Sequence, residues 1–179
     1  MLVYGDSLSA GYGIAQQSAW PALLAKRLAR EKPGWQLVNA SIGGETSAGG
    51  RTRLPQALER FQPRVFVLAL GANDGLRGLS LAQMRENLRA MIRLARQQGA
   101  RVLLVGTRLP PNYGPVYTTE FADSFAQLAR EEKVALLPFL LEPVALDDAA
   151  FQADRLHPTA AAQPKIADHV WGALRPLLR

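Results

Sequence analysis

Five short apolar runs, separated by segments with helical periodicity, constrain the fold of this chain more than any other feature. Most of these runs are continuously apolar rather than alternating, as in strands that are covered on both faces. The runs span residues 2–4, 36–40, 65–70, 102–106 and 134–137, and the helical segments span residues 18–30, 47–60, 80–98, 119–132 and 161–174. Strand and helix alternate from end to end, which predicts an α/β domain with a parallel sheet between two layers of helices.

The segment 80–98 is the clearest helix. Ser80 and Gln83 have the spacing of a capping box, and Gly99 is a natural stop. For the segment 18–30 we expect Ser18 as the cap and Pro21 in the first turn, a position that proline tolerates.

Composition restricts the class of protein further. At 179 residues, with 48% hydrophobic and 20% charged residues, we expect one domain over residues 1–179. The absence of cysteine excludes disulfides and thiolate chemistry. No run approaches the roughly 18 apolar residues of a membrane span, so we expect no integral membrane segment. The net charge of +6 comes from scattered arginines, which indicates a basic solvated surface and no nucleic-acid partner.

Polar and glycine-rich loops follow the predicted strands. In open parallel sheets, the loops beyond the carboxyl ends of the strands lie along one edge and carry the function. Here these loops read GDSLS, SIGGETSAGG, GANDGLRG and TRLPPNYG, with ADRLHP before the last helix. They supply a hydroxyl, a carboxylate, an imidazole, a side-chain amide and an exposed backbone amide, from Ser7, Asp154, His157, Asn73 and Gly44. This set contains a nucleophile, a group that orients a base, the base itself and oxyanion donors.

The chain has two histidines. His169 lies inside a helical segment with no motif around it, so we interpret it as structural or solvated. His157 follows Asp154 by three residues in a turn closed by Pro158, so that the carboxylate can hold Nδ1–H and leave Nε2 free to accept a proton. The pair alone leaves other interpretations open, namely a capping aspartate beside a surface histidine, or half of a metal site. A metal site would need further ligands at fitting spacing, and the sequence offers none.

The stretch GDSLSAGYG after the first strand could cradle a phosphate or present a reactive serine. It matches neither of the glycine patterns typical of phosphate loops, so the nucleophile interpretation is favoured. Ser7 and Ser9 compete for that role. Ser7 lies closer to the strand end, where a sharp turn exposes a side chain together with its amide, and we therefore predict Ser7 as the nucleophile.

The motifs GDSLS, NASIGGETS, GAND and DRLHP resemble, in this order and spacing, the four sequence blocks of the GDSL or SGNH hydrolases. Within that family the chain resembles the bacterial acyl-thioesterase I, protease I and lysophospholipase group, also described as arylesterases. The resemblance covers essentially the whole chain, including NDGLRG, RLPPNYG, LLPF and AAQPKIAD.

The resemblance implies a flavodoxin-like three-layer fold with a five-stranded parallel sheet in the order 2-1-3-4-5. It also implies a triad of Ser7, Asp154 and His157, with the N–H groups of Ser7 and Gly44 and the amide of Asn73 as the oxyanion hole. Two positions depart from the family pattern. Ala72 stands where close relatives usually have glycine, and Arg155-Leu156 replaces a common Gly-Ile, which places a cation near the triad.

The sequence therefore predicts a serine hydrolase of carboxylic esters and acyl thioesters that needs no metal and no organic cofactor. Its partner would be a small-molecule acyl ester or thioester, and we expect a monomer. The acyl groove would be lined by apolar residues from two loops, namely Leu76, Leu79, Leu109, Pro110 and Tyr113. Two alternatives are a carbohydrate O-acetylesterase with the same triad and a non-catalytic binding module.

Relatives of this type are commonly exported, so the resemblance also implies a periplasmic or secreted location, with the leader absent from this chain. A cytoplasmic location stays open.

Overall fold

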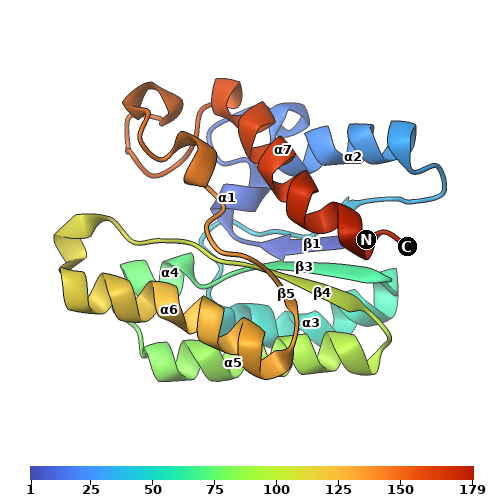
Figure 1. Ribbon diagram of the computed structural model, residues 1–179, viewed down its shortest axis with the longest axis horizontal. Helices are drawn as coiled ribbons and strands as arrows, with labels where there is room; N and C mark the ends of the chain where they lie inside the picture. Colours follow the sequence, from blue (N-terminus) through green and yellow to red (C-terminus); the bar gives the residue numbers. More distant parts are fainter.

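The predicted strands form one parallel sheet in the computed structural model, which describes residues 1–179 (Figure 1). The strands are β1 (Leu2–Gly5), β2 (Val38–Asn39), β3 (Val65–Ala69), β4 (Arg101–Val105) and β5 (Ala135–Leu137). Their order across the sheet is β2-β1-β3-β4-β5, and all neighbouring pairs are parallel. The predicted α/β architecture and strand order are therefore confirmed.

Helices cover both faces of the sheet. They are α1 (Ser7–Ala10), α2 (Trp20–Glu31), α3 (Ser47–Phe61), α4 (Ala72–Leu76), α5 (Leu81–Gln97), α6 (Pro115–Glu132) and α7 (Gln163–Leu174). Short 3-10 helices span Gln16–Ser18, Pro111–Tyr113, Glu142–Val144, Asp148–Ala150, Ala160–Ala162 and Arg175–Leu177. In Figure 1, α2 and α7 lie above the sheet and α3, α5 and α6 lie below it.

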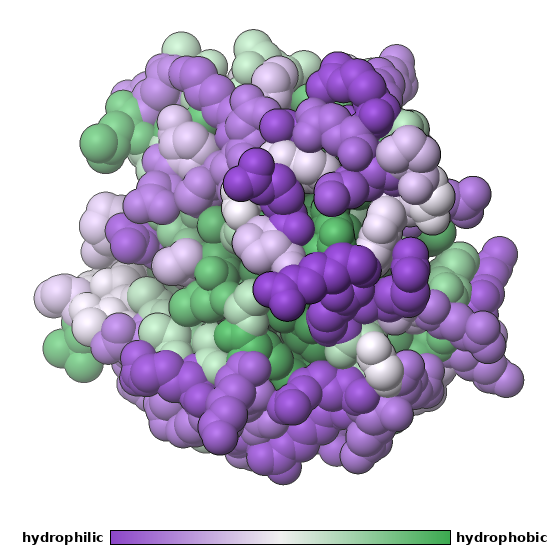
Figure 2. Space-filling model, turned by 45° about the vertical axis from the view of Figure 1, so that its right-hand side comes forward, coloured by the Kyte–Doolittle hydropathy of each residue, from purple (hydrophilic) through white to green (hydrophobic).

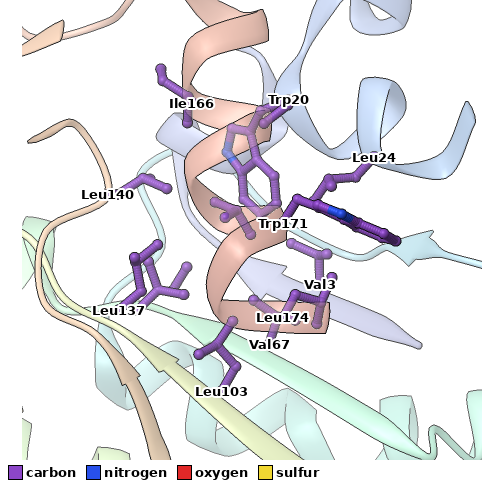
Figure 3. Close-up of a cluster of buried hydrophobic side chains, with 14 of the residues drawn as sticks. Val3, Trp20, Leu24, Val67, Leu103, Leu137, Leu140, Ile166, Trp171 and Leu174 are labelled. Carbon is purple, nitrogen blue, oxygen red and sulfur yellow. The ribbon is translucent and has the colours of Figure 1, made fainter. Parts of the chain in front are cut away.

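The continuous apolar runs are explained by these two layers. Successive side chains of a strand point to opposite faces, so Val3 joins the core beneath α2 and α7, while Leu2 and Tyr4 join the core on the opposite face. Figure 3 shows the first core, where Trp20 and Trp171 lie among aliphatic side chains from the strands. Both faces of β1 are fully buried, which leaves the strand no polar side.

Two of the expected helix starts differ in their capping. Ser80 caps α5 by accepting the N–H of Gln83 at 3.2 Å, but the Gln83 side chain donates to Asn87, so only half of the predicted capping box forms. Ser18 does not cap α2, because residues 16–18 form a 3-10 turn of their own. The N–H of Trp20 is instead satisfied by the side chain of Gln163, 143 residues further along the chain.

Four other elements also differ from the expectation. α6 begins at Pro115 rather than at residue 119, because proline is well suited to the first helical turn. β2 is reduced to two residues. The four- and five-residue helices α1 and α4 lie in loops where no helix was expected, since they are too short to show a periodic pattern.

The carboxyl ends of the strands point to the left in Figure 1, where α1 and α4 lie, and both chain ends lie on the right. On the face in Figure 2, hydrophilic side chains predominate above and below a mid-height band of apolar ones. None of the helices combines the length and the apolar character that a membrane span requires.

Candidate active site

Ser7 is the first residue of α1, directly beyond the carboxyl end of β1. The chain turns sharply here because Asp6 caps the helix, accepting the N–H of Leu8 at 3.0 Å. The backbone N–H of Ser7 donates to no group of the protein. Ser7 therefore presents both its hydroxyl and an unpaired backbone N–H at the edge of the sheet where the strands end.

Ser7, His157 and Asp154 form a continuous hydrogen-bonded chain. Ser7 Oγ lies 2.8 Å from His157 Nε2, and His157 Nδ1 lies 2.6 Å from Asp154 Oδ2. The other carboxylate oxygen, Oδ1, accepts the backbone N–H groups of His157 at 3.0 Å and Leu156 at 2.9 Å. The N–H of His157, followed by that of Leu156, lowers the pKa of Asp154 to about 2. A carboxylate that stays charged holds Nδ1–H and leaves Nε2 to accept a proton from the hydroxyl.

The two competing residues lie elsewhere. Ser9 is fully buried and its hydroxyl has no hydrogen-bond partner. His169 Nε2 lies 3.0 Å from the carbonyl oxygen of Phe139, in the loop after β5. Neither residue lines the cavity that contains Ser7 and His157.

Asn73 lies in α4, at the carboxyl end of β3, and its Nδ2 donates to the carbonyl oxygen of Glu45 at 3.0 Å. Gly71 begins α4 without a side-chain cap, so the amide of Asn73 does not cap its own turn. An amide nitrogen carries two protons, so one remains for another acceptor.

Gly44 precedes Glu45 in the loop after β2. Its φ of +75° is a conformation that glycine adopts without steric cost. Its N–H donates to no group of the protein, and its carbonyl accepts from Arg77 at 3.0 Å. The loop is thus tied to α4 through the carbonyl of Glu45 and to Arg77, at the C-terminal end of α4, through the carbonyl of Gly44.

A cavity of about 390 Å³ opens beside Ser7 and His157. Of the five residues expected in the acyl groove, Leu76, Leu109 and Pro110 line it. Leu79 and Tyr113 do not. Both side chains are exposed, and the Tyr113 hydroxyl donates to the carbonyl of Leu76 at 2.9 Å.

Sequence reasoning missed the opposite wall of the cavity. It is supplied by the segment after β5 and by the turn before α7, from Phe139, Leu141, Ala145, Phe151 and Leu156. The apolar run LLPF, residues 136–139, which begins inside β5, was the available signal, but nothing in it tells a buried loop from a cavity wall. The chain contains no group of three or more histidine, aspartate or glutamate side chains that could hold a metal ion.

Comparison with known proteins decides the family. The sequence profile of the GDSL-like Lipase/Acylhydrolase family matches residues 3–163. The chain belongs to this family. It is an ester hydrolase, and the predicted resemblance is confirmed.

Individual members of the family are similar over nearly the whole chain. Esterase TesA of Pseudomonas aeruginosa is 50% identical over 178 residues, which cover 99% of this chain and 89% of that protein. Thioesterase 1/protease 1/lysophospholipase L1 of Escherichia coli is 43% identical over 182 residues, covering 99% and 84%. The crystal structure of the psychrotrophic esterase EstA from Pseudoalteromonas sp., inhibited by monoethylphosphonate, superposes with a TM-score of 0.94 at 38% identity, covering 99% and 97%.

A cluster of buried polar side chains lies behind the GAND motif of this chain, residues 71–74, and the sequence analysis did not predict it. Asp74 accepts the N–H of Ser47 at 2.8 Å and the hydroxyl of Ser47 at 2.5 Å. Asn87 of α5 donates to the same hydroxyl at 3.1 Å. All three side chains are buried, so the cluster fastens the start of α3 to α4 and α5 directly behind Asn73.

Two further groups lie close to the Ser7–His157 pair. Burial raises the pKa of Asp6 to about 6, from an ordinary value of 3.8, and the hydrogen bond from Leu8 opposes that rise. The ring of Tyr12 lies against the imidazole of His157, with 4.4 Å between ring centroids.

Proposed function

We propose that the protein hydrolyses carboxylic esters and acyl thioesters through a serine nucleophile, with Ser7, His157 and Asp154 acting as a triad. The observation that carries this proposal is the unbroken chain from Ser7 Oγ to His157 to Asp154, with separations of 2.8 and 2.6 Å. Its position at the mouth of a largely apolar cavity supports an acyl substrate.

In the proposed reaction, His157 Nε2 takes the proton of Ser7 as Ser7 Oγ forms a bond to the acyl carbon. The resulting tetrahedral intermediate collapses, the bond to the leaving alcohol or thiol breaks, and His157 delivers the proton to it. Water then attacks the acyl-enzyme with the same proton transfers and releases the carboxylic acid and Ser7. Asp154 stays ionised and stabilises the imidazolium that forms in each step.

The oxyanion of the intermediate would be bound by the N–H groups of Ser7 and Gly44 and the remaining amide proton of Asn73. Three unused donors support this assignment, because each is otherwise a polar group without a partner in the protein.

The relatives named esterase and thioesterase/lysophospholipase support both ester and thioester substrates. The apolar cavity walls favour medium acyl chains over the acetyl groups of sugars, which would suit a shallow polar pocket. Rates on medium-chain 4-nitrophenyl esters and on acetylated sugars separate the two substrate classes. A binding module without activity would hydrolyse neither.

The test compares two serines of the same short helix. Ser7→Ala should lose turnover by roughly 10³-fold or more, since the triad works as a unit. Ser9→Ala removes a buried hydroxyl that has no partner and should retain activity. A phosphonate ester should modify the wild type stoichiometrically, with the adduct located at Ser7 by mass spectrometry. Retained activity in Ser7→Ala, or an adduct elsewhere, would contradict the proposed nucleophile.

A further inference from the structure

Arg155 has a backbone conformation that is unfavourable for residues other than glycine. Its φ is +56°, in the left-handed region, whereas eight of the positions with positive φ are glycine. The two other non-glycine residues with positive φ, Gln62 and Lys133, each terminate a long helix, which explains their conformation. Arg155 lies at no helix end.

The backbone at Arg155 is needed for the turn, but the side chain is not. Its N–H closes the turn on the carbonyl of Gln152 at 2.9 Å, and the next two N–H groups both reach Asp154 Oδ1. Glycine would adopt this conformation at lower cost. The guanidinium forms no hydrogen bond and no ion pair, so the fold gains nothing from it.

The side chain instead lines the cavity beside His157. Arg108 lines the same cavity, with its guanidinium carbon 5.1 Å from the centre of the Phe139 ring and without an ion pair. One acidic residue, Asp148, also lines the cavity, and its carboxylate pairs with neither arginine. The cavity is therefore lined by two arginines without an ion pair and by one carboxylate, and half of its lining residues are hydrophobic.

The position of Arg155 indicates which half of a substrate it would meet. In the proposed reaction His157 delivers a proton to the leaving group, so the leaving group must lie next to Nε2. Arg155 belongs to the same turn, two residues before His157. The acyl chain would occupy the apolar part of the cavity, and the leaving group would lie against this turn.

We propose that Arg155, together with Arg108, forms a subsite for an anionic group, a carboxylate or a phosphate, on the alcohol or thiol half of the substrate. Guanidinium groups bind both oxyanions in a bidentate manner. This inference rests on the proposed hydrolase function and extends it to the choice of leaving group. A residue in a strained backbone conformation whose side chain forms no hydrogen bond or ion pair, and which lines the same cavity as Ser7 and His157, is typical of a functional position.

The experiment uses two thioesters that differ in one charge, S-butyryl-3-mercaptopropionate and its neutral amide, S-butyryl-3-mercaptopropionamide. Released thiol is measured with a chromogenic thiol reagent, which reacts with product alone because the protein has no cysteine. The readout is the ratio of kcat/KM for the anionic substrate to that for the neutral one. The ratio cancels any general effect of a substitution on the triad.

Arg155→Gln removes the charge and should lower this ratio about threefold to tenfold, as expected for a partly solvent-exposed ion contact. Arg155→Lys should retain most of the ratio. Lys133→Gln is the matched control, since it removes a cation from another left-handed residue that does not line the cavity. Raising NaCl from about 20 mM to about 0.5 M should lower the wild-type ratio and leave that of Arg155→Gln flat.

Arg155→Gly tests the conformational part of the argument. It should lower the ratio as Arg155→Gln does, while its melting temperature stays equal to or above that of the wild type. An unchanged ratio in Arg155→Gln would overturn the subsite. Equal losses on both thioesters with a clearly lower melting temperature would also overturn it, by making Arg155 a structural residue. If the wild type hydrolyses neither thioester, the thioester part of the proposed function fails instead.

Discussion

The side-chain amide of Asn73 has two protons, of which one is bound by the carbonyl of Glu45 at 3.0 Å. If the second binds the oxyanion, its removal should affect the transition state and not substrate binding. Asn73→Ala should lower kcat by about 10²–10³-fold with little change in KM, in steady-state kinetics on a 4-nitrophenyl ester.

Asn73→Asp separates this role from a purely structural one. The substitution keeps the size of the side chain but places an acceptor where a donor is required, so its kcat should be at least as low as that of Asn73→Ala. Each variant loses one hydrogen bond to Glu45, which should cost about 1 kcal/mol and a few degrees in melting temperature. A fully active Asn73→Asp enzyme would remove Asn73 from the oxyanion hole.

Asp6 is a buried carboxylate whose pKa is raised to about 6 by burial. Its folded pKa exceeds the ordinary value of 3.8, so its contribution to stability is fully present below pH 3.8 and is lost as pH rises through 6. Asp6→Asn keeps a capping oxygen and removes the charge. Relative to the wild type, it should gain on the order of 2–3 kcal/mol between pH 4 and pH 8, measured by urea unfolding.

Asp147→Asn is the control for Asp6. Asp147 also caps a short helix, accepting the N–H of Ala149 at 3.1 Å, but it is exposed. Its substitution should change stability equally at both pH values. A pH-independent effect of Asp6→Asn would show that the carboxylate is not destabilised by burial.

At the scale of secondary-structure elements, a local sequence pattern predicts a feature only where contacts between residues close in the sequence determine it. The α5 cap at Ser80 was predictable because both partners lie within one turn. The start of α2 was not, because its first N–H is bound by Gln163 from α7, and no local pattern encodes that contact. α1 and α4 exist because the loops turn tightly around Ser7 and Asn73, and their length hides any periodicity.

The start of α3 depends on a contact of the same kind. Ser47 binds the buried Asp74 through its N–H and its hydroxyl, so Ser47→Ala leaves Asp74 and Asn87 short of a partner. This should destabilise the protein by about 1–3 kcal/mol. Because Asp74 directly follows Asn73, kcat should fall while KM changes little. Thermal melts and steady-state kinetics measure the two effects.

Thr52→Ala is the matched control in α3, since the Thr52 hydroxyl binds only the carbonyl of Ala48 in its own helix and is exposed. It should leave kcat unchanged and alter the melting temperature little. If Ser47→Ala lowered stability without lowering kcat, the buried cluster would hold the helices together without positioning Asn73.

At the scale of the whole molecule, the parallel sheet explains why the candidate site could be anticipated. The loops after β1 and β3 and the segment after β5 meet at one edge of the sheet. Ser7 Oγ and His157 Nε2 therefore come within 2.8 Å, although 150 residues separate them in the sequence. The sequence predicts which loops meet there. It does not predict which side chains of those loops face the cavity, and for that reason it includes Leu79 and Tyr113, which do not line it.

Activity and the contribution of Asp6 to stability should respond to pH in opposite directions. Between pH 8 and pH 5 the activity should fall, because an imidazolium cannot accept the proton of a serine hydroxyl. Asp154 cannot cause the loss. Its pKa is lowered to about 2, so its contribution to stability is present above the ordinary value of 3.8 and is lost only as pH falls through 2. Asp6 takes up a proton near pH 6 and makes the fold more stable as the pH falls. Initial rates and melting temperatures, measured on the same samples from pH 8 to pH 5, should therefore diverge.

His169→Gln should show the same acid limb as the wild type, since His169 does not line the cavity. If the rate and the melting temperature fell together, the acid limb would reflect unfolding and not the protonation of a base.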